Sequence, residues 1–326
     1  MRRTITAVLA ALALTMGAAA HAADAHAADT KKPETIRFAY QLSHSNFVIA
    51  NDQGWFKDEF AKDGITFDAR LFVSGPPIIE AFAGSRIDFG LTGDQPALLA
   101  RANNIDIKAV GVPISGGKGL ALLVPPDSPA QSIADLKGKK IGVTVGSVAH
   151  HFLFILLKNA GLKPSDIQLV NLSPPDIKLA LEQHNIDAGL PWDPWLSILE
   201  EEHNAKKLVT AEGIKPNANV ILVSAAFARD YPDIVERILK VFLRAETFIK
   251  EHPQEAIAIT AKATGYKPEV VARYIPNQSY DIRLTPAVID SYELTTSFLR
   301  EGGVLRRDVS VAELVDASFL KHIGAQ

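Results

Sequence analysis

Short apolar runs alternate with amphipathic stretches along most of this 326-residue chain, and this alternation constrains its fold more than any other feature. The apolar runs have the length of strands, whereas the stretches between them carry apolar residues at the three- and four-residue spacing of helices. The predicted strands lie at residues 35–40, 65–72, 86–92, 105–113, 120–126, 141–147, 167–172, 186–191 and 218–227. Strand, helix and strand at this spacing form βαβ units, so the sequence predicts an α/β fold with mostly parallel sheets.

The strand pattern restarts midway along the chain, and only amphipathic helices follow the last strand. We therefore predict two α/β lobes, with the helical tail packed on lobe 1. Lobe 1 is expected to comprise residues 34–120 and 222–326, and lobe 2 the inserted residues 121–221. The apolar strands at 120–124 and 219–224 are expected to cross between the lobes and to form a hinge over a ligand cleft. A single large doubly wound sheet is the alternative.

The first 22 residues have the pattern of a secretory signal peptide. Two arginines precede the apolar run ITAVLAALALTMGAAA, and the Ala-His-Ala sequence at 20–22 offers a cleavage site with small residues. The run is shorter than the ~20 residues that a membrane span needs. We expect cleavage after residue 22, a flexible lead-in at 23–33, and a change in formal charge from −3 to −5 through the loss of the two arginines.

The absence of cysteine and the modest formal charge of −3 exclude several kinds of protein. Without cysteine there is no disulfide, thiolate metal site, cysteine nucleophile or lipidated N-terminal cysteine. No basic excess indicates nucleic acid binding. The nine histidines show no metal-ligand spacing, and the adjacent pair His150 and His151 would point ~100° apart on a helix. We expect a monomer that is free in the periplasm, with no cofactor and no metal.

Polar residues and glycines gather where the predicted strands end and the next helices begin, which is the edge where open α/β sheets bind ligands. The candidate ligand-binding residues in these turns are Gln41, Ser43, His44, Ser74, Gly75, Thr92, Gly93, Gly146, Ser147 and His150. No lysine or arginine occurs there, so unpaired N–H groups at converging helix N-termini would bind an anion without an ion pair. A sulfonate suits such a site. Each turn taken alone is also typical of an ordinary helix cap.

The stretch GLPWDPWLS, residues 189–197, places a rigid aromatic turn directly after an apolar strand. Asp193 is expected to cap the following helix, and Pro194 to be its first residue. Trp192 precedes this cap at the strand exit, so its ring is predicted to form an apolar wall for an alkyl or aryl ligand tail. Trp195 and Trp55 are predicted to lie in the core.

Two acidic residues, Asp94 and Asp193, complete the candidate site, and both stand at predicted helix starts. A carboxylate beside a bound anion would repel it. We expect each to be either a helix cap or a group at the far end of the ligand, where it could accept a hydrogen bond from an amine such as that of taurine.

Four segments of the chain occur in the order found in one known group of proteins: GWFKDEF, SGPPIIEAFAGSRIDFGLTGDQPALLARANN, DLKGKKIGVTVGSVAHHFLFILLKNAGL and NIDAGLPWDPWLS. In them the chain resembles the periplasmic solute-binding proteins of ABC importers for aliphatic sulfonates, within the nitrate/sulfonate/taurine group. The resemblance implies a two-lobed type II periplasmic-binding-protein fold, also called a Venus flytrap, with two crossover strands. It implies a sulfonate held by donors near Gln41, Thr92–Gly93 and Ser147, and delivered for sulfur acquisition to a permease coupled to an ATPase.

Other ligands remain open. The first turn, YQLSHSN, has less glycine than this group leads us to expect, and two histidines stand at a helix start. Taurine, nitrate, an aromatic carboxylate and a thiamine-precursor pyrimidine are the alternatives. Nitrate would need little apolar wall, and a carboxylate would usually recruit an arginine, whereas Arg70, Arg86 and Arg101 lie near the turns but outside them. Enzymes that resemble this group rely on a cysteine, so we expect no catalysis.

Overall fold

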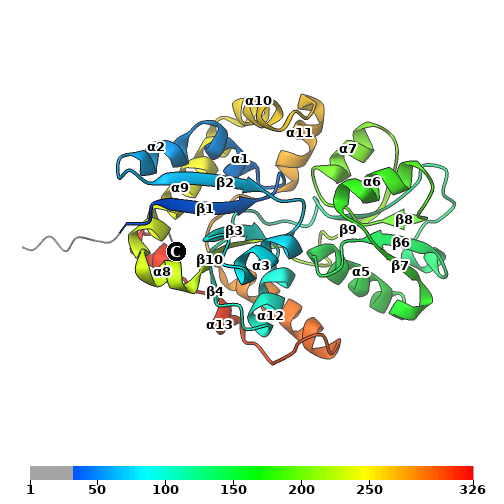
Figure 1. Ribbon diagram of the computed structural model, residues 1–326. Coiled ribbons are helices and arrows are strands. Elements are labelled where there is room, and N and C mark those ends of the chain that lie inside the picture. Colours follow the sequence, from blue (N-terminus) through cyan, green and yellow to red (C-terminus); the bar gives the residue numbers. More distant parts are fainter. Residues whose placement is uncertain (1–31, 326) are drawn as a thin grey trace, which may run out of the picture. The chain divides into compact units, whose positions relative to one another are not determined.

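Two five-stranded sheets organise residues 32–325, the part of the chain that the computed structural model describes (Figure 1). The first sheet contains β1 (Thr35–Tyr40), β2 (Thr66–Leu71), β3 (Phe89–Thr92), β4 (Ile107–Gly111) and β10 (Val220–Ser224). The second contains β5 (Ala121–Val124), β6 (Lys140–Val143), β7 (Gln168–Asn171), β8 (Ala188–Gly189) and β9 (Lys206–Thr210). The predicted signal peptide, and all but the last two residues of the predicted lead-in, lie outside the described residues.

The two sheets have the same topology. Their strand orders are β2-β1-β3-β10-β4 and β7-β6-β8-β5-β9, and the fourth strand in each order, β10 or β5, runs antiparallel to its neighbours. The remaining neighbours, such as β1 with β2 and β6 with β7, are parallel. The predicted two-lobed α/β architecture is confirmed, and the single doubly wound sheet is excluded.

Helices cover both sheets and form the tail. Those that follow strands of the first sheet are α1 (Ser45–Asp52), α2 (Trp55–Ala61), α3 (Gly75–Ala83) and α4 (Asp94–Ala102). Those of the second lobe are η1 (Ile133–Leu136), α5 (Val148–Asn159), η2 (Pro164–Asp166), α6 (Pro174–Glu182) and α7 (Trp195–Glu201). The tail contains α8 (Ala225–Asp230), α9 (Pro232–Glu251), α10 (Pro253–Thr264), α11 (Pro268–Tyr274), η3 (Ile275–Asn277), α12 (Pro286–Glu301), α13 (Val311–Leu314) and α14 (Ser318–His322).

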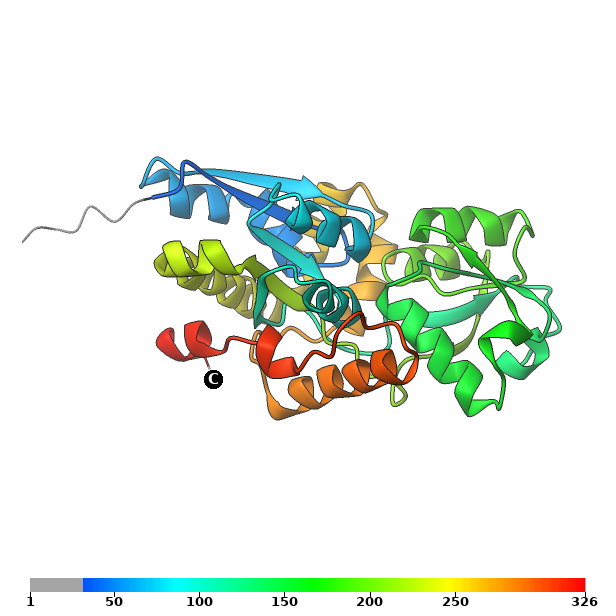
Figure 2. The ribbon, with the colours of Figure 1, turned by 60° about the horizontal axis from the view of Figure 1, so that its bottom comes forward.

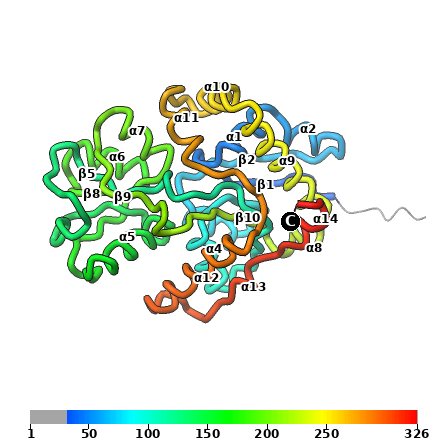
Figure 3. Tube along the Cα trace, turned by 180° about the vertical axis from the view of Figure 1, so that it is seen from behind, coloured from blue at the N-terminus to red at the C-terminus, as the bar shows by residue number. Residues whose placement is uncertain are grey.

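The helical tail packs on both faces of the first sheet, as Figures 2 and 3 show. Neighbouring residues of β1 point to opposite faces: Phe38 joins a cluster with Ile238 of α9, whereas Ala39 joins another with Tyr292 of α12. All four side chains are fully buried. The prediction that the tail builds no sheet of its own and packs on lobe 1 therefore holds.

The chain crosses between the lobes in two irregular segments, 112–120 and 211–219, and not in the strands we expected. The predicted crossing strands at 120–124 and 219–224 become β5 and β10, and each lies within one sheet. The crossing segments form one isolated β-bridge, between Ser115 and Ala218, and they also meet where Ala211 N donates to the carbonyl of Leu120 at 2.9 Å. Pro113 and Pro216 lack the N–H that a strand ladder needs, which explains why regular pairing does not extend through the crossings.

Candidate functional site

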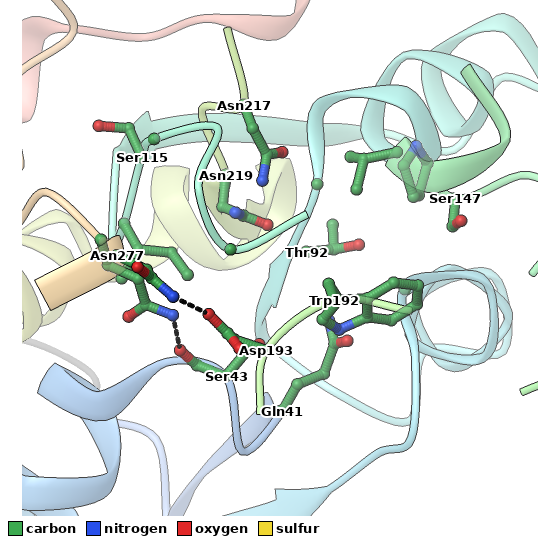
Figure 4. A pocket seen from close by; sticks show the side chains of 18 residues that line it. Gln41, Ser43, Thr92, Ser115, Ser147, Trp192, Asp193, Asn217, Asn219 and Asn277 are labelled. Atoms are coloured by element: carbon green, nitrogen blue, oxygen red, sulfur yellow. Dashed lines mark hydrogen bonds between the residues drawn. The ribbon is translucent and has the colours of Figure 1, made fainter. Parts of the chain in front are cut away.

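A small pocket lies between the lobes, where the turns after β1, β2, β3, β6 and β8 meet the crossing segments and the tail (Figure 4). It is lined by Gln41, Ser43, Gly75, Thr92, Gly93, Pro96, Ile114, Ser115, Gly116, Gly119, Ser147, Val148, Trp192, Asp193, Asn217, Asn219, Asn277 and Gln278. Its volume is about 40 Å³. At about 10–15 Å³ for one water, this leaves room for about three water-sized groups.

Eight of the thirteen candidate residues line this pocket. They are Gln41, Ser43, Gly75, Thr92, Gly93, Ser147, Trp192 and Asp193. They come from five separate turns, which meet because the carboxyl ends of parallel strands share one edge of a sheet. The two strand-end edges face each other across the cleft, so turns from both lobes contribute.

Neutral hydrogen-bonding groups dominate the pocket. The described residues contribute no lysine, arginine or histidine to its lining, and Asp193 is the one charged residue among them. Two buried atoms of the lining, Thr92 Oγ1 and Asn217 Oδ1, have no hydrogen-bond partner among residues 32–325. α3, α4 and α5 begin here, and the first N–H groups of a helix have no partner within it. The pocket can therefore donate several hydrogen bonds to one small anion.

Two glycines make the close packing of this site possible. A Cβ on Gly75 would stand 2.1 Å from Thr92 Oγ1, and one on Gly93 would stand 2.2 Å from Val148 Cγ1. Both distances are far below van der Waals contact. Gly75 thus lets the N-terminus of α3 approach β3, and Gly93 lets α4 of lobe 1 approach α5 of lobe 2.

Asp193 lines the pocket and also links the lobes. Its Oδ1 accepts hydrogen bonds from the backbone N–H and hydroxyl of Ser197 at 3.1 and 2.7 Å, and its Oδ2 accepts one from Asn277 Nδ2 at 2.9 Å. Burial raises the pKa of Asp193 to about 6, although these hydrogen bonds oppose the increase. The helix α7 begins at Trp195 with Pro194 at the N-cap, one residue later than predicted.

Of the three tryptophans, Trp192 lines the pocket, whereas Trp55 and Trp195, which were predicted to lie in the core, are only partly buried. Trp192 is partly buried and its ring lies beside the pocket, so it is available as an apolar wall (Figure 4). Trp55 and Trp195 are also partly buried and pack against core clusters of the first lobe and the tail. Arg244 covers the Trp55 ring at 3.9 Å. Neither Trp55 nor Trp195 lines the pocket.

Asp94 does not line the pocket, in contrast to the prediction that it belongs to the site. Its carboxylate is fully buried and forms an ion pair with Lys215 at 2.9 Å, and it accepts a hydrogen bond from Thr295 Oγ1. Gly93, and not Asp94, is the N-cap residue of α4. Asp94 therefore ties the start of α4 to the second crossing segment and to α12.

Four other candidates lie outside the lining of this pocket. His44 is buried, with its Nδ1 3.3 Å from the carbonyl of Gln41, and burial lowers its pKa to about 4. Ser74 is the buried N-cap residue of α3. Gly146 and His150 line a different cavity next to α5. These four residues lie in or beside the turns that form the pocket, but neighbouring residues such as Ser43, Gly75 and Ser147 line it in their place.

The asparagine-rich part of the pocket was not predicted from the sequence. Ser115, Asn217 and Asn219 belong to the crossing segments, and Asn277 and Gln278 follow α11 in the tail. The only local signal was the polar composition of KPNAN and PNQS beside prolines, which ordinary turns share. Their position in the site depends on how the tail packs against the lobes.

Comparison with known proteins decides the family. A sequence model described as NMT1/THI5-like matches residues 41–256. The chain belongs to the NMT1/THI5-like family. A putative aliphatic sulfonates-binding protein of Bacillus subtilis is 32% identical over 98% of this chain and 96% of its own. The taurine-binding periplasmic protein of Escherichia coli is 29% identical over 82% of this chain and 87% of its own.

A solved structure agrees with this membership. The alkanesulfonate-binding protein SsuA from Xanthomonas axonopodis pv. citri, bound to MOPS, superposes on this NMT1/THI5-like chain with a TM-score of 0.82. The two are 29% identical, and the match covers 88% of this chain and 99% of that one. Within residues 32–325, no helix combines the length and apolar character that crossing a bilayer requires. In the same range, no group of three or more His, Asp or Glu side chains could hold a metal ion.

Proposed function

We propose that this protein is the solute-binding component of an ABC importer, and that it captures an aliphatic sulfonate between its lobes for sulfur acquisition. The observation that carries the proposal is a pocket between two lobes that offers neutral donors and helix N-termini but no cationic side chain. Such a pocket suits an anion that is ionised at every relevant pH and needs no counter-charge. The sulfonate-binding relatives support the same cargo.

The proposed mechanism is reversible capture without chemistry. In the open form the turns of both lobes are exposed, and a sulfonate that contacts both lobes shifts the population toward the closed form. Contacts across the cleft already exist in the form described here: Asn277 donates to Asp193 at 2.9 Å, and Arg273 of α11 pairs with Glu201 of α7 at 2.6 Å. The closed shape is then recognised by a membrane permease coupled to an ATPase.

Within the pocket, the unpartnered hydroxyl of Thr92 is proposed to donate to the sulfonate together with the first N–H groups of α4 and α5. The hydroxyl of Ser147 already donates to the carbonyl of Thr144 at 2.7 Å. Gln41 is held in place by donating to the carbonyl of Leu91 at 3.1 Å, which turns its amide toward the pocket edge. Trp192 is proposed to contact the alkyl tail. The limited volume favours a short sulfonate in this closed form.

Taurine is a second candidate cargo because of one observation, the carboxylate of Asp193 at the pocket. An anionic carboxylate disfavours a bound anion, but it would accept a hydrogen bond from an ammonium group at the other end of the same ligand. An amino-sulfonate would satisfy both ends of the pocket.

We further propose that the protein is exported, cleaved after residue 22 and not lipidated, and that it acts as a monomer in the periplasm. Membership of a family of periplasmic binding proteins supports the location.

We also propose the lobe boundaries 34–120 with 222–326 for lobe 1 and 121–221 for lobe 2. Sheet membership supports them, except that Val220 and Ile221 already pair in the first sheet.

The test is the thermal stability of the ligand-free mature protein against a panel of methane- to octanesulfonate, taurine, benzenesulfonate, nitrate, sulfate and matched carboxylates. A specific ligand at 100 times its Kd should add about 2.7 kcal/mol to the free energy of unfolding. Sulfonates should raise the melting temperature where the matched carboxylates do not. A flat response to every sulfonate would overturn the proposed cargo.

A further inference from the structure

A second, larger cavity lies between α5 of lobe 2 and α12 of the tail, two helices that are neighbours in Figures 1 and 3. We call it the α5–α12 cavity. Its lining includes Gln95, His150, His151, Phe154, Leu294 and Phe298. Its volume is about 980 Å³, at the upper end of the ~300–1,000 Å³ typical of small-molecule pockets. It shares no lining residue with the pocket between the lobes.

Aromatic rings form the walls of the α5–α12 cavity. His151 stacks on Phe298 with ring centroids 3.9 Å apart and an angle of 17° between the planes. His150 lies 4.5 Å from Phe154, and Phe154 lies 5.8 Å from Phe298. Flat rings at these separations offer faces and edges that a further flat ring can contact.

Two buried polar groups of this cavity have no partner. His151 and Gln95 are each 2% exposed, and neither His151 Nδ1 nor Gln95 Oε1 has a hydrogen-bond partner among residues 32–325. A buried polar atom without a partner is costly, so a bound group that pairs with it is favoured. These atoms point to a ligand with a hydrogen-bonding group.

The charge of the cavity argues against an ionic ligand. Lys215 lines it, but its ammonium is already paired with Asp94 at 2.9 Å. Burial, the largest cause, and the nearby Lys215 lower the pKa of His151 to about 3, so this ring is neutral at neutral pH. At the rim, Lys158 is paired with Glu301 at 3.3 Å, whereas the exposed Lys163 forms no ion pair within residues 32–325 and lies outside the aromatic interior. The interior is thus neutral, aromatic and able to form hydrogen bonds.

We propose that the α5–α12 cavity binds a flat, uncharged aromatic molecule that carries one hydrogen-bonding group, such as a phenol or an aromatic alcohol. The half-buried rings of Phe154 and Phe298 contact its faces, and the amide of Gln95 pairs with its hydroxyl. The proposal does not rest on the identity of the cargo, because the two sites share no lining residue. An occupant would touch both α5 and α12, and hence both lobes.

The test is calorimetric titration of the full mature protein with 2-naphthol, alongside naphthalene as a probe without a hydroxyl. We expect saturable 1:1 binding of 2-naphthol that excess methanesulfonate does not displace, and at least tenfold weaker binding of naphthalene. Leu294→Arg places a charge at the mouth, where Leu294 is 60% exposed, and should weaken 2-naphthol binding at least tenfold. Leu179→Arg is the matched control, because Leu179 is 51% exposed on α6 and lines neither site.

Gln95→Leu separates the hydrogen bond from the shape of the cavity. It should weaken 2-naphthol about tenfold and leave naphthalene unchanged. The proposal is overturned if the wild-type protein shows no saturable 2-naphthol binding up to its solubility, or if Leu294→Arg binds with wild-type affinity while melting as a folded protein. Full displacement by methanesulfonate would also overturn it, because the probe would then occupy the pocket between the lobes.

Discussion

Gly93 and Val148 meet across the cleft, so closely that a Cβ added to Gly93 would stand 2.2 Å from Val148 Cγ1. Gly93 follows β3 of lobe 1, whereas Val148 is the first residue of α5 in lobe 2. The φ angle of Gly93 is −77°, which any residue adopts, so the need for glycine here comes from space and not from the backbone. Closure of the lobes depends on that missing side chain.

Gly93→Ala should therefore oppose closure without harming either lobe, because opening the cleft relieves the clash. We expect sulfonate affinity to fall at least tenfold by calorimetry while the melting temperature of the ligand-free protein changes little. Gly90→Ala is the contrasting variant. Its Cβ would stand 2.7 Å from Ile78 and 2.9 Å from Phe82, within lobe 1, so it should lower the melting temperature. Wild-type affinity in Gly93→Ala would contradict closure at this contact.

Thr92→Val tests the unpartnered hydroxyl of the pocket. Thr92 is fully buried and its Oγ1 has no partner among the described residues, so an isosteric valine removes a cost of about 1–3 kcal/mol. The ligand-free variant should be at least as stable as the wild type in urea. Its sulfonate affinity should nevertheless fall about tenfold or more, because a hydrogen bond to an anion is lost. A variant that binds normally would remove Thr92 from the site.

Asp193 should make stability depend on pH. Its folded pKa of about 6 exceeds its ordinary value of 3.8, so its contribution is fully present below pH 4 and is lost as pH rises through 6. At about 1.4 kcal/mol for each pH unit, this loss is on the order of 3 kcal/mol. Urea unfolding from pH 4 to pH 7 should show the wild type losing this stability relative to Asp193→Asn. Parallel pH profiles would show that Asp193 is not buried as described.

The same carboxylate should weaken anion binding once it ionises. Methanesulfonate affinity of the wild type should fall between pH 5 and pH 7, and Asp193→Asn should flatten this profile. If taurine is the cargo, Asp193→Asn should instead weaken taurine at pH 7 while strengthening methanesulfonate. Equal effects on both ligands would leave no role for Asp193 in recognising an amine.

Lys215→Met should destabilise the fold strongly, because it leaves the fully buried carboxylate of Asp94 without its counter-charge. Removing one partner of a buried pair typically costs about 3–5 kcal/mol. The double variant Asp94→Asn with Lys215→Met should recover much of this loss in urea unfolding. A cost below about 1 kcal/mol for Lys215→Met would mean that Asp94 has another partner.

Trp192→Ala tests the apolar wall. The variant should weaken octanesulfonate more than methanesulfonate, because a longer tail has more apolar surface to place against the ring. Calorimetric titration of both ligands gives the two affinities. Equal losses for all chain lengths would assign Trp192 to the shape of the pocket and not to contact with the tail.

The strands were predictable because short apolar runs between prolines, glycines and polar turns have few alternatives. β1 begins and ends where the sequence placed it, and most other strands differ only at their ends. β9 was not predicted from the sequence. Its segment KKLVT begins with two lysines and is largely half-buried, so it lacks the apolar run by which the other strands were found. The predicted strand at 218–227 ends early, because Ser224 caps α8 by accepting from the N–H of Phe227 at 3.2 Å.

The sequence by itself determined the two-lobed α/β class and the strand-end turns that meet in the pocket, because hydrophobic periodicity and the spacing of strand and helix in βαβ units can be followed along the chain. Only the tertiary structure decided which way the turn residues face. Asp94 turns away from the pocket because Lys215, 121 positions later, compensates its charge in the interior. Asn217 and Asn277 enter the pocket because the crossing segments and the tail fold back onto the cleft, and such long-range packing leaves no periodic trace in the chain.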